Sequence, residues 1–444
     1  MTTKKLTDYI KQSISVQGTK KEEQPNHVQA RILFKKETEL QETPIGKIPK
    51  EWKVVKLSDV AEIRGNKSIN KVNKIAFIPM ELIPDSGVFV RYEIRDLDDV
   101  SSFTYCEAGD ILLAKITPSF ENGKQGIVPD DVPNRFALTT TEVYPIACKQ
   151  VNRLFLFYIL KHPKFRKILE HSMRGTTGRR RVPRDALENL EMPIPPLSEQ
   201  KVVAEILSTV DLAIDRVRRL VERAERLKKG LMQELFTKGI GHKEYKETPI
   251  GKIPKEWKIV RLGDVVEVWD NYRVPVKEQD RERGEYPYCG ANGIIDYVNG
   301  YTHDGEFVLL AEDGGFFGPY EKSAYIMRGK IWANNHVHVL KAIEGRATNE
   351  FLMFYLNFMD LRPFLTGSTR PKLTQKDMLR IPIPLPPLSE QREITKILSS
   401  VDEYIGLLRV KLERLEHVKK WLMDVLLTGK VRVMVEPSSG GSSG

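Results

Sequence analysis

A string of twelve residues occurs twice in this chain and constrains its fold more than any other feature. The sequence ETPIGKIPKEWK stands at residues 42–53 and again, unchanged, at residues 247–258. The copies are 205 residues apart (247 − 42), and the similarity continues as VVKLSDVAEI against IVRLGDVVEV. Identity of this length arises by duplication rather than by chance, so the chain is expected to contain two copies of one structural unit.

A second repeated marker lies downstream of the first. MPIPPLSEQKVVAEILSTVD at residues 192–211 matches IPLPPLSEQREITKILSSVD at residues 383–402. The offset here is 191 (383 − 192), so the second intervening segment is shorter by 14 residues (205 − 191). Between the two markers the sequences differ strongly. The duplicated unit therefore has constant ends and a variable middle.

The two markers predict different local structures. The prolines of the first marker exclude a helix and favour an extended path, and Trp52 and Trp257 are expected to anchor the start of each unit by burying their rings. In the second marker, PPLSEQ predicts the start of a helix that Ser198 or Ser389 can cap. A stretch of about 39 residues without proline follows each copy, which corresponds to a helix of ~58 Å.

The residues after PPLSEQ show a coiled-coil pattern, in which apolar side chains recur every seven residues. In the first helix one series is Val203, Val210, Val217, Ala224 and Leu231, and a second is Ile206, Ala213, Leu220 and Leu227. In the second helix the series is Ile394, Val401, Leu408, Leu415 and Leu422. The pattern predicts two long helices that pair antiparallel, and the charged outer faces are interpreted as solvated.

The variable segments have the composition of compact α/β (α+β) domains. GDILLAKIT, FALTTTEVYPIA and EFVLLAEDGG are predicted strands, and residues 323–340 are predicted to form a hairpin turning near Arg328 and Gly329. Each segment has one late amphipathic helix, at residues 152–173 and 348–365, with a Phe-Tyr pair assigned to the core. The expected organisation is a segment 1–41, a globular domain 42–194, a helix 195–238, a second domain 239–385, a second helix 386–428 and a tail 429–444, whose end EPSSGGSSG is expected to be flexible.

Charge and cysteine content limit the class of protein. Lysine and arginine number 70 against 60 acidic residues, and this excess favours a polyanion such as DNA as the partner. The three cysteines, Cys106, Cys148 and Cys289, are far apart and odd in number, which argues against disulfides and a thiolate zinc site. No apolar run reaches the ~18 residues that span a bilayer, and no signal peptide is recognisable. A cytoplasmic location is expected.

Two loops are the best candidates for DNA contact, because each combines glycine, hydroxyl and basic residues where a variable segment rejoins its marker. They are MRGTTGRRRVPR at residues 173–184 and TGSTRPKL at residues 366–373. Glycines allow close approach of the backbone, hydroxyl and basic groups bind phosphates, and arginine also reads guanine edges. The alternative is a solvated basic loop. The candidate DNA-binding residues are Lys115, Lys124, Arg174, Thr176, Thr177, Arg179, Arg180, Arg181, Ser368, Thr369, Arg370 and Lys372.

Two unlike domains held by paired helices predict a bipartite duplex site. Each domain would read its own half-site, and the half-sites would differ because the domains differ. Unread base pairs would lie between them, with their number set by the helices.

The signatures of catalysis are weak. The chain has no P-loop and no Asn-Pro-Pro-aromatic motif of adenine methyltransferases. A nuclease pattern can be drawn from Asp130, Glu199 and Lys201, but the last two open the repeated helix. His336 and His338 would share a strand face and could bind a metal, yet no third ligand is near in the sequence, so neither a catalytic nor a metal site is predicted. An enzyme and a protein-binding scaffold remain the alternatives to a DNA-binding subunit.

The PIGxIPxxW start, the GTT or GST loop and the PPLSEQ helix opening, each present twice, resemble the specificity subunit of a Type I restriction–modification system. The resemblance implies two target-recognition domains, no catalysis and no cofactor in this chain. It also implies assembly with two methyltransferase subunits and with restriction subunits, which would bind S-adenosylmethionine, ATP and Mg. The outer helix faces, including Arg218 and Arg219, and the proline-rich starts are the expected surface for the methyltransferases.

Overall fold

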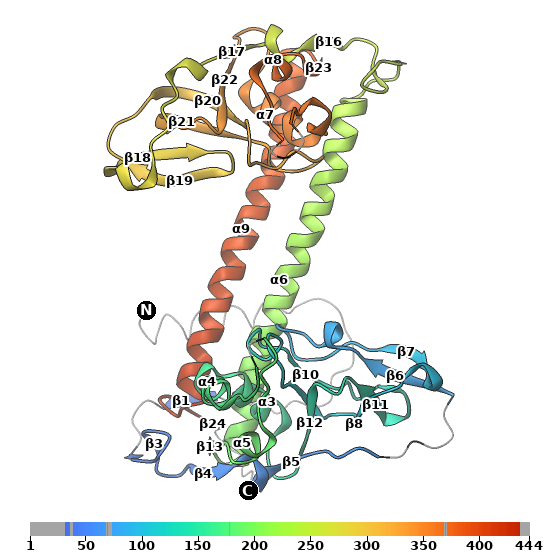
Figure 1. Ribbon diagram of the computed structural model, residues 1–444, viewed down its shortest axis with the longest axis vertical. Coiled ribbons are helices and arrows are strands. Elements are labelled where there is room, and N and C mark those ends of the chain that lie inside the picture. The colour runs from blue at the N-terminus through green and yellow to red at the C-terminus, as the bar shows by residue number, and fades with distance from the viewer. Residues whose placement is uncertain are drawn as a thin grey trace, which may run out of the picture. The chain divides into compact units, whose positions relative to one another are not determined.

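The computed structural model describes residues 32–35, 39–67, 69, 73–176, 178–367, 369 and 371–435, and Figure 1 shows their arrangement. These residues form two compact units. Unit 1 comprises the described residues up to Ala213 together with those from Glu416 onward, and unit 2 comprises Ile214–Leu415. Each unit contains one copy of both markers, one variable segment and a part of each long helix. The units thus follow the sequence repeat, although their limits fall within the helices.

Unit 1 is built on two four-stranded sheets whose central strands are buried. One sheet has the order β10-β9-β12-β5 and the other β7-β6-β11-β8, and in the second β11 and β6 run parallel. The strands of the first are β5 (Ala61–Ile63), β9 (Ile111–Ala114), β10 (Gln125–Ile127) and β12 (Val143–Cys148). Those of the second are β6 (Lys74–Ile78), β7 (Glu93–Asp96), β8 (Thr104–Glu107) and β11 (Phe136–Thr139). The predicted strands GDILLAKIT and FALTTTEVYPIA are confirmed, the latter as two strands in different sheets.

The late helix of unit 1 is broken into two. α3 (Arg153–Lys161) and α4 (Pro163–Ser172) meet at His162, where Pro163 has no amide hydrogen to continue the first helix. Asn152 caps α3 by accepting a hydrogen bond from the Phe155 amide, at 3.0 Å. The Phe157 and Tyr158 side chains are fully buried, as predicted. The short helices α2 (Leu57–Val60) and α5 (Arg184–Glu188) pack nearby.

Unit 2 contains one six-stranded sheet of order β17-β22-β20-β21-β18-β19. Its strands are β17 (Val266–Val268), β18 (Arg283–Gly290), β19 (Gly293–Val298), β20 (His303–Ala311), β21 (Ala324–Ala333) and β22 (Val337–Ala342). α7 (Asn349–Phe358) packs on β20, β21 and β22, and its Phe354 and Tyr355 are buried in the core.

The hairpin predicted at Arg328 and Gly329 is wrong. These residues lie inside β21, and the strand that pairs with β21 is β20, with Gly329 opposite Gly305. β22 pairs with the other edge of β20, so the predicted partners are separated by a strand from earlier in the sequence. The glycine pair removes side chains from the centre of a long strand pair rather than marking a turn.

The markers of each unit are brought together as a pair of strands. In unit 1, β4 (Lys53–Lys56) from the first marker pairs antiparallel with β13 (Glu191–Ile194) from the second. In unit 2, β16 (Lys258–Arg261) pairs in the same way with β23 (Pro382–Leu385). The other short elements are β2 (Leu40–Gln41), β3 (Ile48–Pro49), β14 (Tyr245–Lys246), β15 (Ile253–Pro254), α8 (Gln375–Met378), η1 (Met80–Leu82), η2 (Leu97–Asp99), η3 (Pro133–Arg135), η4 (Leu262–Asp264), η5 (Asp270–Tyr272), η6 (Glu278–Asp280) and η7 (Arg362–Phe364).

The tryptophan of each first marker is locked to the glutamate of PPLSEQ. The Trp52 indole nitrogen donates to Glu199 at 3.2 Å, and the Trp257 indole nitrogen donates to Glu390 at 2.9 Å. Both rings are buried, which confirms their predicted anchoring role. A buried carboxylate needs partners, and the indole supplies one in each unit.

The glutamine of PPLSEQ closes the same junction in both units. Gln200 accepts from the Asn152 amide at 2.8 Å, and Gln391 accepts from the Thr348 amide at 3.1 Å. Each glutamine also donates to a proline carbonyl of its own marker. The Glu-Gln pair therefore connects the start of the long helix to the start of the marker and to the cap of the late helix.

Both long helices form as predicted. α6 extends over Leu197–Lys238 and α9 over Leu388–Leu426. The serine caps are not observed, because Ser198 and Ser389 are already the second residues of their helices and a proline precedes each start. Figure 1 shows the two helices in both units.

The second predicted apolar series of α6 is correct only in its first half, where Ile206 and Ala213 are half-buried. The series beginning at Val203 is buried or half-buried, but Leu220 and Leu227 of the second series are exposed, at 40% and 57%. The side chains that accompany the first series lie four residues after it, as Leu207, Ile214 and Leu235 do. In α9 the predicted series is confirmed, and Leu398 and Ile405 accompany it at the same spacing of four.

The helices are joined by a repeated ion pair that fixes their direction. In unit 1, Lys419 of α9 lies 2.6 Å from Asp211 of α6; in unit 2, Lys228 of α6 lies 2.6 Å from Asp402 of α9. The two aspartates are 191 residues apart (402 − 211), and so are the two lysines (419 − 228). Each helix supplies the acid in one unit and the amine in the other. An antiparallel pair of duplicated helices produces this exchange.

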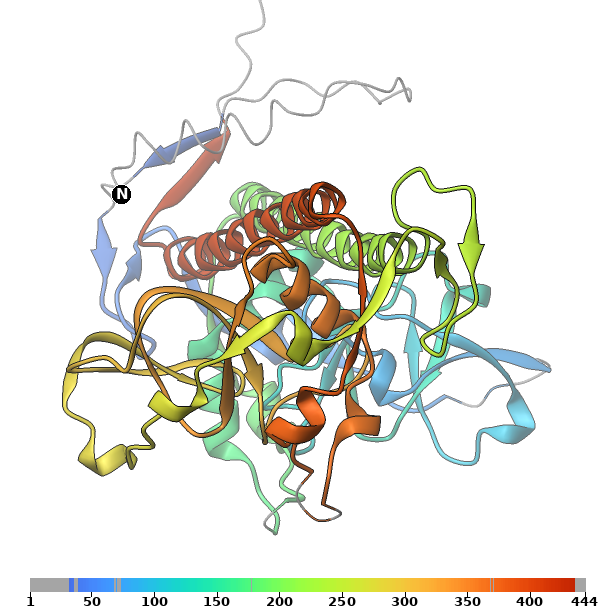
Figure 2. The ribbon, with the colours of Figure 1, turned by 90° about the horizontal axis from the view of Figure 1, so that it is seen from above.

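Residues after α9 return to the start of unit 1. β24 (Arg432–Val435) pairs antiparallel with β1 (Ile32–Lys35), and Figure 2 shows these strands side by side. Arg432 donates to Glu199 through Nη2, at 2.8 Å, and so completes the Trp52–Glu199 junction. In unit 2 His242 lies at the corresponding place, 2.9 Å from Glu390. Part of the expected tail 429–444 is thus structured, while residues 436–444 lie outside the described residues.

Within the described chain, no helix has the length and apolar character needed to cross a membrane.

Candidate DNA interface

The first predicted DNA loop is a small hairpin anchored beside β9. Arg174 and Arg181 exchange backbone hydrogen bonds of 3.0 and 2.8 Å, which closes the loop. Arg181 is also paired with Ile116, and the Thr117 amide donates to the Arg180 carbonyl at 3.0 Å. The loop is therefore held along the segment that follows β9.

Two basic side chains at the base of this loop have partners. Arg181 makes two hydrogen bonds to the Glu142 carboxylate, at 2.9 and 2.7 Å, and these bonds lower the pKa of Glu142. Lys115 is half-buried, with its ammonium 4.9 Å from the Tyr144 ring centre. Burial lowers the pKa of Lys115, and Arg181 adds to this effect while Glu142 opposes it.

The remaining candidate residues of unit 1 differ in the exposure and in the ion pairs of their side chains. Arg174 is largely exposed beside Asp185, at 3.4 Å, and Thr176 is exposed. Arg180 lies 3.4 Å from Glu121. The Arg179 side chain is exposed and forms no hydrogen bond or ion pair with any other described residue. Thr177 lies outside the described residues.

Lys124 is engaged in the fold. Its ammonium donates to the carbonyls of Met80, at 2.8 Å, and Ile83, at 3.0 Å. These contacts give it a structural role, and its contact with DNA stays a prediction.

The second predicted loop has the same construction in unit 2. Thr366 and Lys372 exchange backbone hydrogen bonds of 2.9 and 2.8 Å, and Lys372 is paired with Asp313 after β20. The Leu373 amide donates to the Glu312 carbonyl at 2.8 Å, as the Val182 amide donates to the Lys115 carbonyl at 2.9 Å in unit 1. Thr369 is exposed, whereas Ser368 and Arg370 lie outside the described residues.

These backbone bonds identify equivalent positions in the two units. Lys372 corresponds to Arg181, Glu312 to Lys115, and His336, whose carbonyl accepts from the Glu312 amide, to Glu142. The backbone framework is shared, but the charge at each position differs. The sequence indicated the two loops and Lys115 as candidates, but it did not connect them with Glu142, Glu312 and His336.

A buried cluster supports the loop of unit 2. The Lys372 ammonium lies 2.5 Å from Glu312, and Arg273 donates to Glu312 and lies 3.3 Å from Asp270. Burial opposes ionisation of Glu312, but the hydrogen bonds from Lys372 and Arg273, with the neighbouring His338, outweigh it and lower its pKa. The loop base is thus tied to the interior by charge.

His338, which has no third ligand near it in the sequence, has two acidic neighbours in the fold. Ligand atoms of Asp270, Glu312 and His338 lie within 4.8 Å of one another, although Asp270 is 68 residues away in sequence. Nδ1 of His338 faces Asp270 at 2.6 Å and Nε2 faces the Leu373 carbonyl at 2.8 Å. Both ring nitrogens of His338 are therefore already engaged by oxygen atoms of the fold. Arg273 and Lys372 already balance the acids, and this set does not fit a cation.

The other residues that the sequence offered for catalysis or metal binding do not come together in one site. His336 is directed to Asp313, at 2.5 Å, and not toward a site shared with His338. Asp130 forms two hydrogen bonds with Arg153, each 3.0 Å long, whereas Glu199 is buried against Trp52 and Arg432. Asp130 and Glu199 of the nuclease pattern are therefore committed to separate structural contacts.

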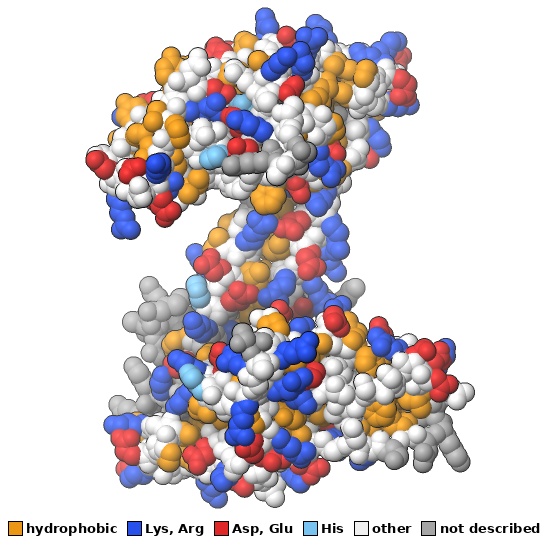
Figure 3. Space-filling model, in the orientation of Figure 1, with side chains coloured by type: hydrophobic (Ala, Val, Ile, Leu, Met, Phe, Trp, Pro, Cys, Tyr) orange, Lys and Arg blue, Asp and Glu red, His pale blue; other side chains and the backbone are white. Residues whose placement is uncertain are grey.

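The surface around the first loop is basic. Figure 3 shows several Lys and Arg side chains together on the visible face of unit 1, around the part where α3, α4 and α5 lie in Figure 1. A concentration of positive charge beside a glycine-containing loop is the usual footprint of phosphate binding.

Comparison with known families gives a direct match over both units. Residues 49–226 and 254–417 match the family described as Type I restriction modification DNA specificity domain. The chain belongs to this family. Each matched stretch contains the end of one copy of the first marker and all of one copy of the second, so the duplication seen in the sequence is a duplication of the family's domain.

Relatives cover nearly all of the chain. A putative type I restriction enzyme specificity subunit of Methanocaldococcus jannaschii is 29% identical over 90% of this chain and 99% of its own length. A putative specificity subunit of Haemophilus influenzae is 50% identical, but only over 33% of this chain and 37% of its own. The local match is higher than the full-length one, as expected where some segments are constant and others vary.

Solved structures share the fold. The type I S subunit from M. genitalium has a TM-score of 0.57 at 17% identity, and the match covers 87% of this chain and 99% of that one. A chain from a structural study of complex assembly in the type I R-M system has a TM-score of 0.52 at 20% identity, covering 86% and 99%. The α/β units with two long helices are therefore the architecture of this family.

Proposed function

We propose that this specificity subunit recognises an asymmetric bipartite duplex sequence, with one half-site read by each unit. The observation that carries the proposal is the shared backbone framework, in which the loops at 174–181 and 366–372 have the same anchorage and different side chains. A common framework gives both units the same approach to DNA, and the differing side chains give them different base preferences. As a specificity subunit, the chain selects the site and does not carry out catalysis.

Within each loop, the exposed groups are assigned to DNA and the paired groups to support. Arg174, Thr176 and Arg179 in unit 1, and Thr369 in unit 2, are exposed at or near the loop tips. Arg181 and Lys372 fix the loop base through Glu142 and Glu312. Exposed arginines reach phosphates and guanine edges, while a fixed base reduces the entropy lost when the loop is ordered on DNA.

The long helices set the number of unread base pairs between the half-sites. We assign this role to α6 and α9 because both helices are continuous and run through both units. A proline-free helix pair joined by ion pairs resists bending, so it is suited to hold a constant spacing.

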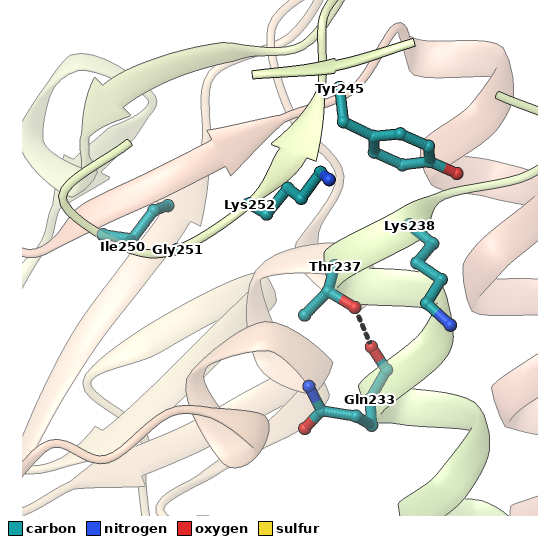
Figure 4. A pocket seen from close by; sticks show the side chains of 7 residues that line it. All are labelled: Gln233, Thr237, Lys238, Tyr245, Ile250, Gly251 and Lys252. Atoms are coloured by element: carbon teal, nitrogen blue, oxygen red, sulfur yellow. Dashed lines mark hydrogen bonds between the residues drawn. The ribbon is translucent and has the colours of Figure 1, made fainter. Parts of the chain in front are cut away.

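The proline-rich starts and outer helix faces are proposed to bind two methyltransferase subunits, through which restriction subunits join. In unit 2 a cleft of about 480 Å³ lies between the end of α6 and the first marker. Figure 4 shows the residues that line it. It is lined by polar and basic side chains, among them Gln233, Lys238, Tyr245 and Lys252. Two identical partners need two similar surfaces, and the markers are the part of the chain that repeats unchanged. S-adenosylmethionine, ATP and Mg are assigned to these partners.

The proposal is tested by sequencing DNA methylation in a host that carries the whole system. A split recognition sequence with two unlike halves, each with a methylated adenine, is expected. Methylation at a continuous or symmetric sequence would contradict it. Failure of the assembled complex to protect any duplex would favour a protein-binding scaffold.

A further inference from the structure

The segment that follows the central strand is equivalent in the two units. LLAKITPSF at residues 112–120 and LLAEDGGFF at residues 309–317 begin with the same Leu-Leu-Ala and end with a buried phenylalanine, Phe120 or Phe317. Ile116 and Asp313, at the same place in these strings, pair with Arg181 and Lys372, the basic residues that close the two predicted DNA loops. Ser119 of unit 1 therefore corresponds to Phe316 of unit 2.

Phe316 is presented to solvent next to the predicted DNA loop. Its side chain is 55% exposed, whereas that of the adjacent Phe317 is 8% exposed. Three residues before it, Asp313 is in backbone register with Lys372. An exposed phenyl ring can gain burial on binding, and the position of Phe316 beside a basic, glycine-containing loop makes this ring available to a ligand of the loop.

The backbone around Phe316 is fixed by close packing. Gly314 has a φ of +65°, and its carbonyl accepts a hydrogen bond of 3.1 Å from the side chain of Asn292, in the turn between β18 and β19. A Cβ on Gly315 would lie 2.4 Å from the Cβ of Ala311. The glycines thus let the segment turn tightly, with Phe317 inward and Phe316 outward.

We propose that Phe316 is a specificity-determining residue of unit 2, whose ring makes apolar contact with a base of the half-site. The thymine C5-methyl group in the major groove is the apolar feature of a base pair that suits a phenyl ring. Duplex DNA is favoured over a protein partner because the neighbouring loop offers phosphate-binding groups. The inference rests on the proposed function, and it names a reading element outside the two loops predicted from the sequence.

The test uses the assembled complex with methyltransferase subunits and a library of duplexes randomised over the site. Phe316→Ala is expected to reduce discrimination about tenfold at one or two adjacent positions in the half-site of unit 2. The half-site of unit 1 should not change. Phe316→Leu keeps apolar volume and should retain most of the preference. Ser119→Phe in unit 1 should introduce a new preference in the other half-site.

Tyr297→Ala is the matched control, because Tyr297 is 52% exposed in the same unit but lies on β19. An equal loss of base discrimination from Tyr297→Ala would show that the effect is not particular to the segment at Phe316, and it would overturn the inference. An unchanged site with Phe316→Ala would also overturn it, and loss of assembly without loss of base preference would indicate a protein contact. If the wild-type complex selects no bipartite site, the proposed function itself fails.

Discussion

At the scale of single residues, the junction at Glu199 shows why the markers are constant. The carboxylate is buried, and it accepts hydrogen bonds from Trp52, from Arg432 and from the Val433 amide. The donors come from the two ends of the chain, and the acceptor Glu199 lies near its middle. The sequence could predict that Trp52 is buried, from its size and its repetition, but not what its indole binds, because that partner is 147 residues away.

Removal of the cation from this junction is expected to be costly. Arg432→Ala should lower the free energy of unfolding by about 3 kcal/mol, because it leaves a buried carboxylate without its charged partner. Urea unfolding of the purified chain measures the loss. Lys430→Ala is the control, because Lys430 and Asp424 form an exposed pair, and a loss below about 0.5 kcal/mol is expected there. Equal losses from both variants would contradict the burial argument.

The cluster under the loop of unit 2 predicts a dependence on pH. The pKa of Glu312 lies below its ordinary value of 4.5 in the folded chain, so the stability it adds is complete above pH 4.5 and is lost as the pH falls through the lowered pKa. Glu312→Gln should therefore cost about 2 kcal/mol at pH 7.5, a figure reduced for the partial exposure of Lys372.

The difference between wild type and Glu312→Gln should shrink when urea unfolding is repeated near pH 3. Glu344→Gln serves as the control, because Glu344 is exposed and forms no ion pair within the described residues. A difference that stays constant over this range would show that the Glu312 charge does not stabilise the loop.

At the scale of elements, heptad counting predicted that both long helices exist and how long they are. It identified only one of the two rows of side chains that α6 buries. The series at Val203 is repeated by Ile394 and was correct, but its companion in α6 was placed one residue too early. A series at Leu220 and Leu227 is more apolar than one at Val221 and Lys228, so composition alone favoured the wrong face. The true seam accepts Lys228 because its ammonium reaches Asp402 while its stem stays half-buried.

The equivalent aspartates of the two helices should differ in importance. Asp211 is buried and accepts from Tyr158, at 2.8 Å, as well as from Lys419, whereas the Asp402 side chain is 40% exposed. Asp211→Ala should cost about 2–3 kcal/mol of unfolding free energy, and Asp402→Ala less than about 1 kcal/mol. Thermal or urea unfolding of the two variants compares them directly, and a larger loss at Asp402 would refute the assignment.

At the scale of the whole molecule, duplication, fold class and the two loops could be predicted, because repeats and local composition are written in the sequence. The contacts that connect distant segments could not. Asp270 reaches His338, and Glu142 reaches Arg181, through the pairing of strands that no local pattern specifies. The hairpin at Arg328 failed for the same reason, because the true neighbour of β21 comes earlier in the chain.

The basic loop predicts how DNA binding responds to salt. Replacement of Arg174 and Arg179 by alanine should weaken binding of the assembled complex about tenfold and reduce the slope of log K against log salt by about 2, because two phosphate contacts are lost. Fluorescence anisotropy at several salt concentrations measures both quantities. Lys149→Ala removes a paired lysine outside the loop and should leave the slope unchanged. An unchanged slope in the double variant would place the phosphate contacts elsewhere.

The helix pair predicts the spacing of the half-sites. Insertion of seven residues into both α6 and α9, between their ion-paired residues, should keep the seam in register and add ~10 Å, or about three base pairs. Methylation sequencing should then report a longer spacer between unchanged half-sites. A constant spacer would show that the helices do not set it.

The reciprocal ion pairs limit how this architecture can change. Each helix must present its aspartate and its lysine on the same face. The stretch between these two residues can therefore lengthen only by whole helical repeats, and the other helix must lengthen by the same number of residues. A gain or loss of a single residue turns the lysine by about 100° away from its aspartate. The number of base pairs between the half-sites is consequently expected to change in discrete steps during evolution. The surfaces that read bases can instead change by one substitution at a time.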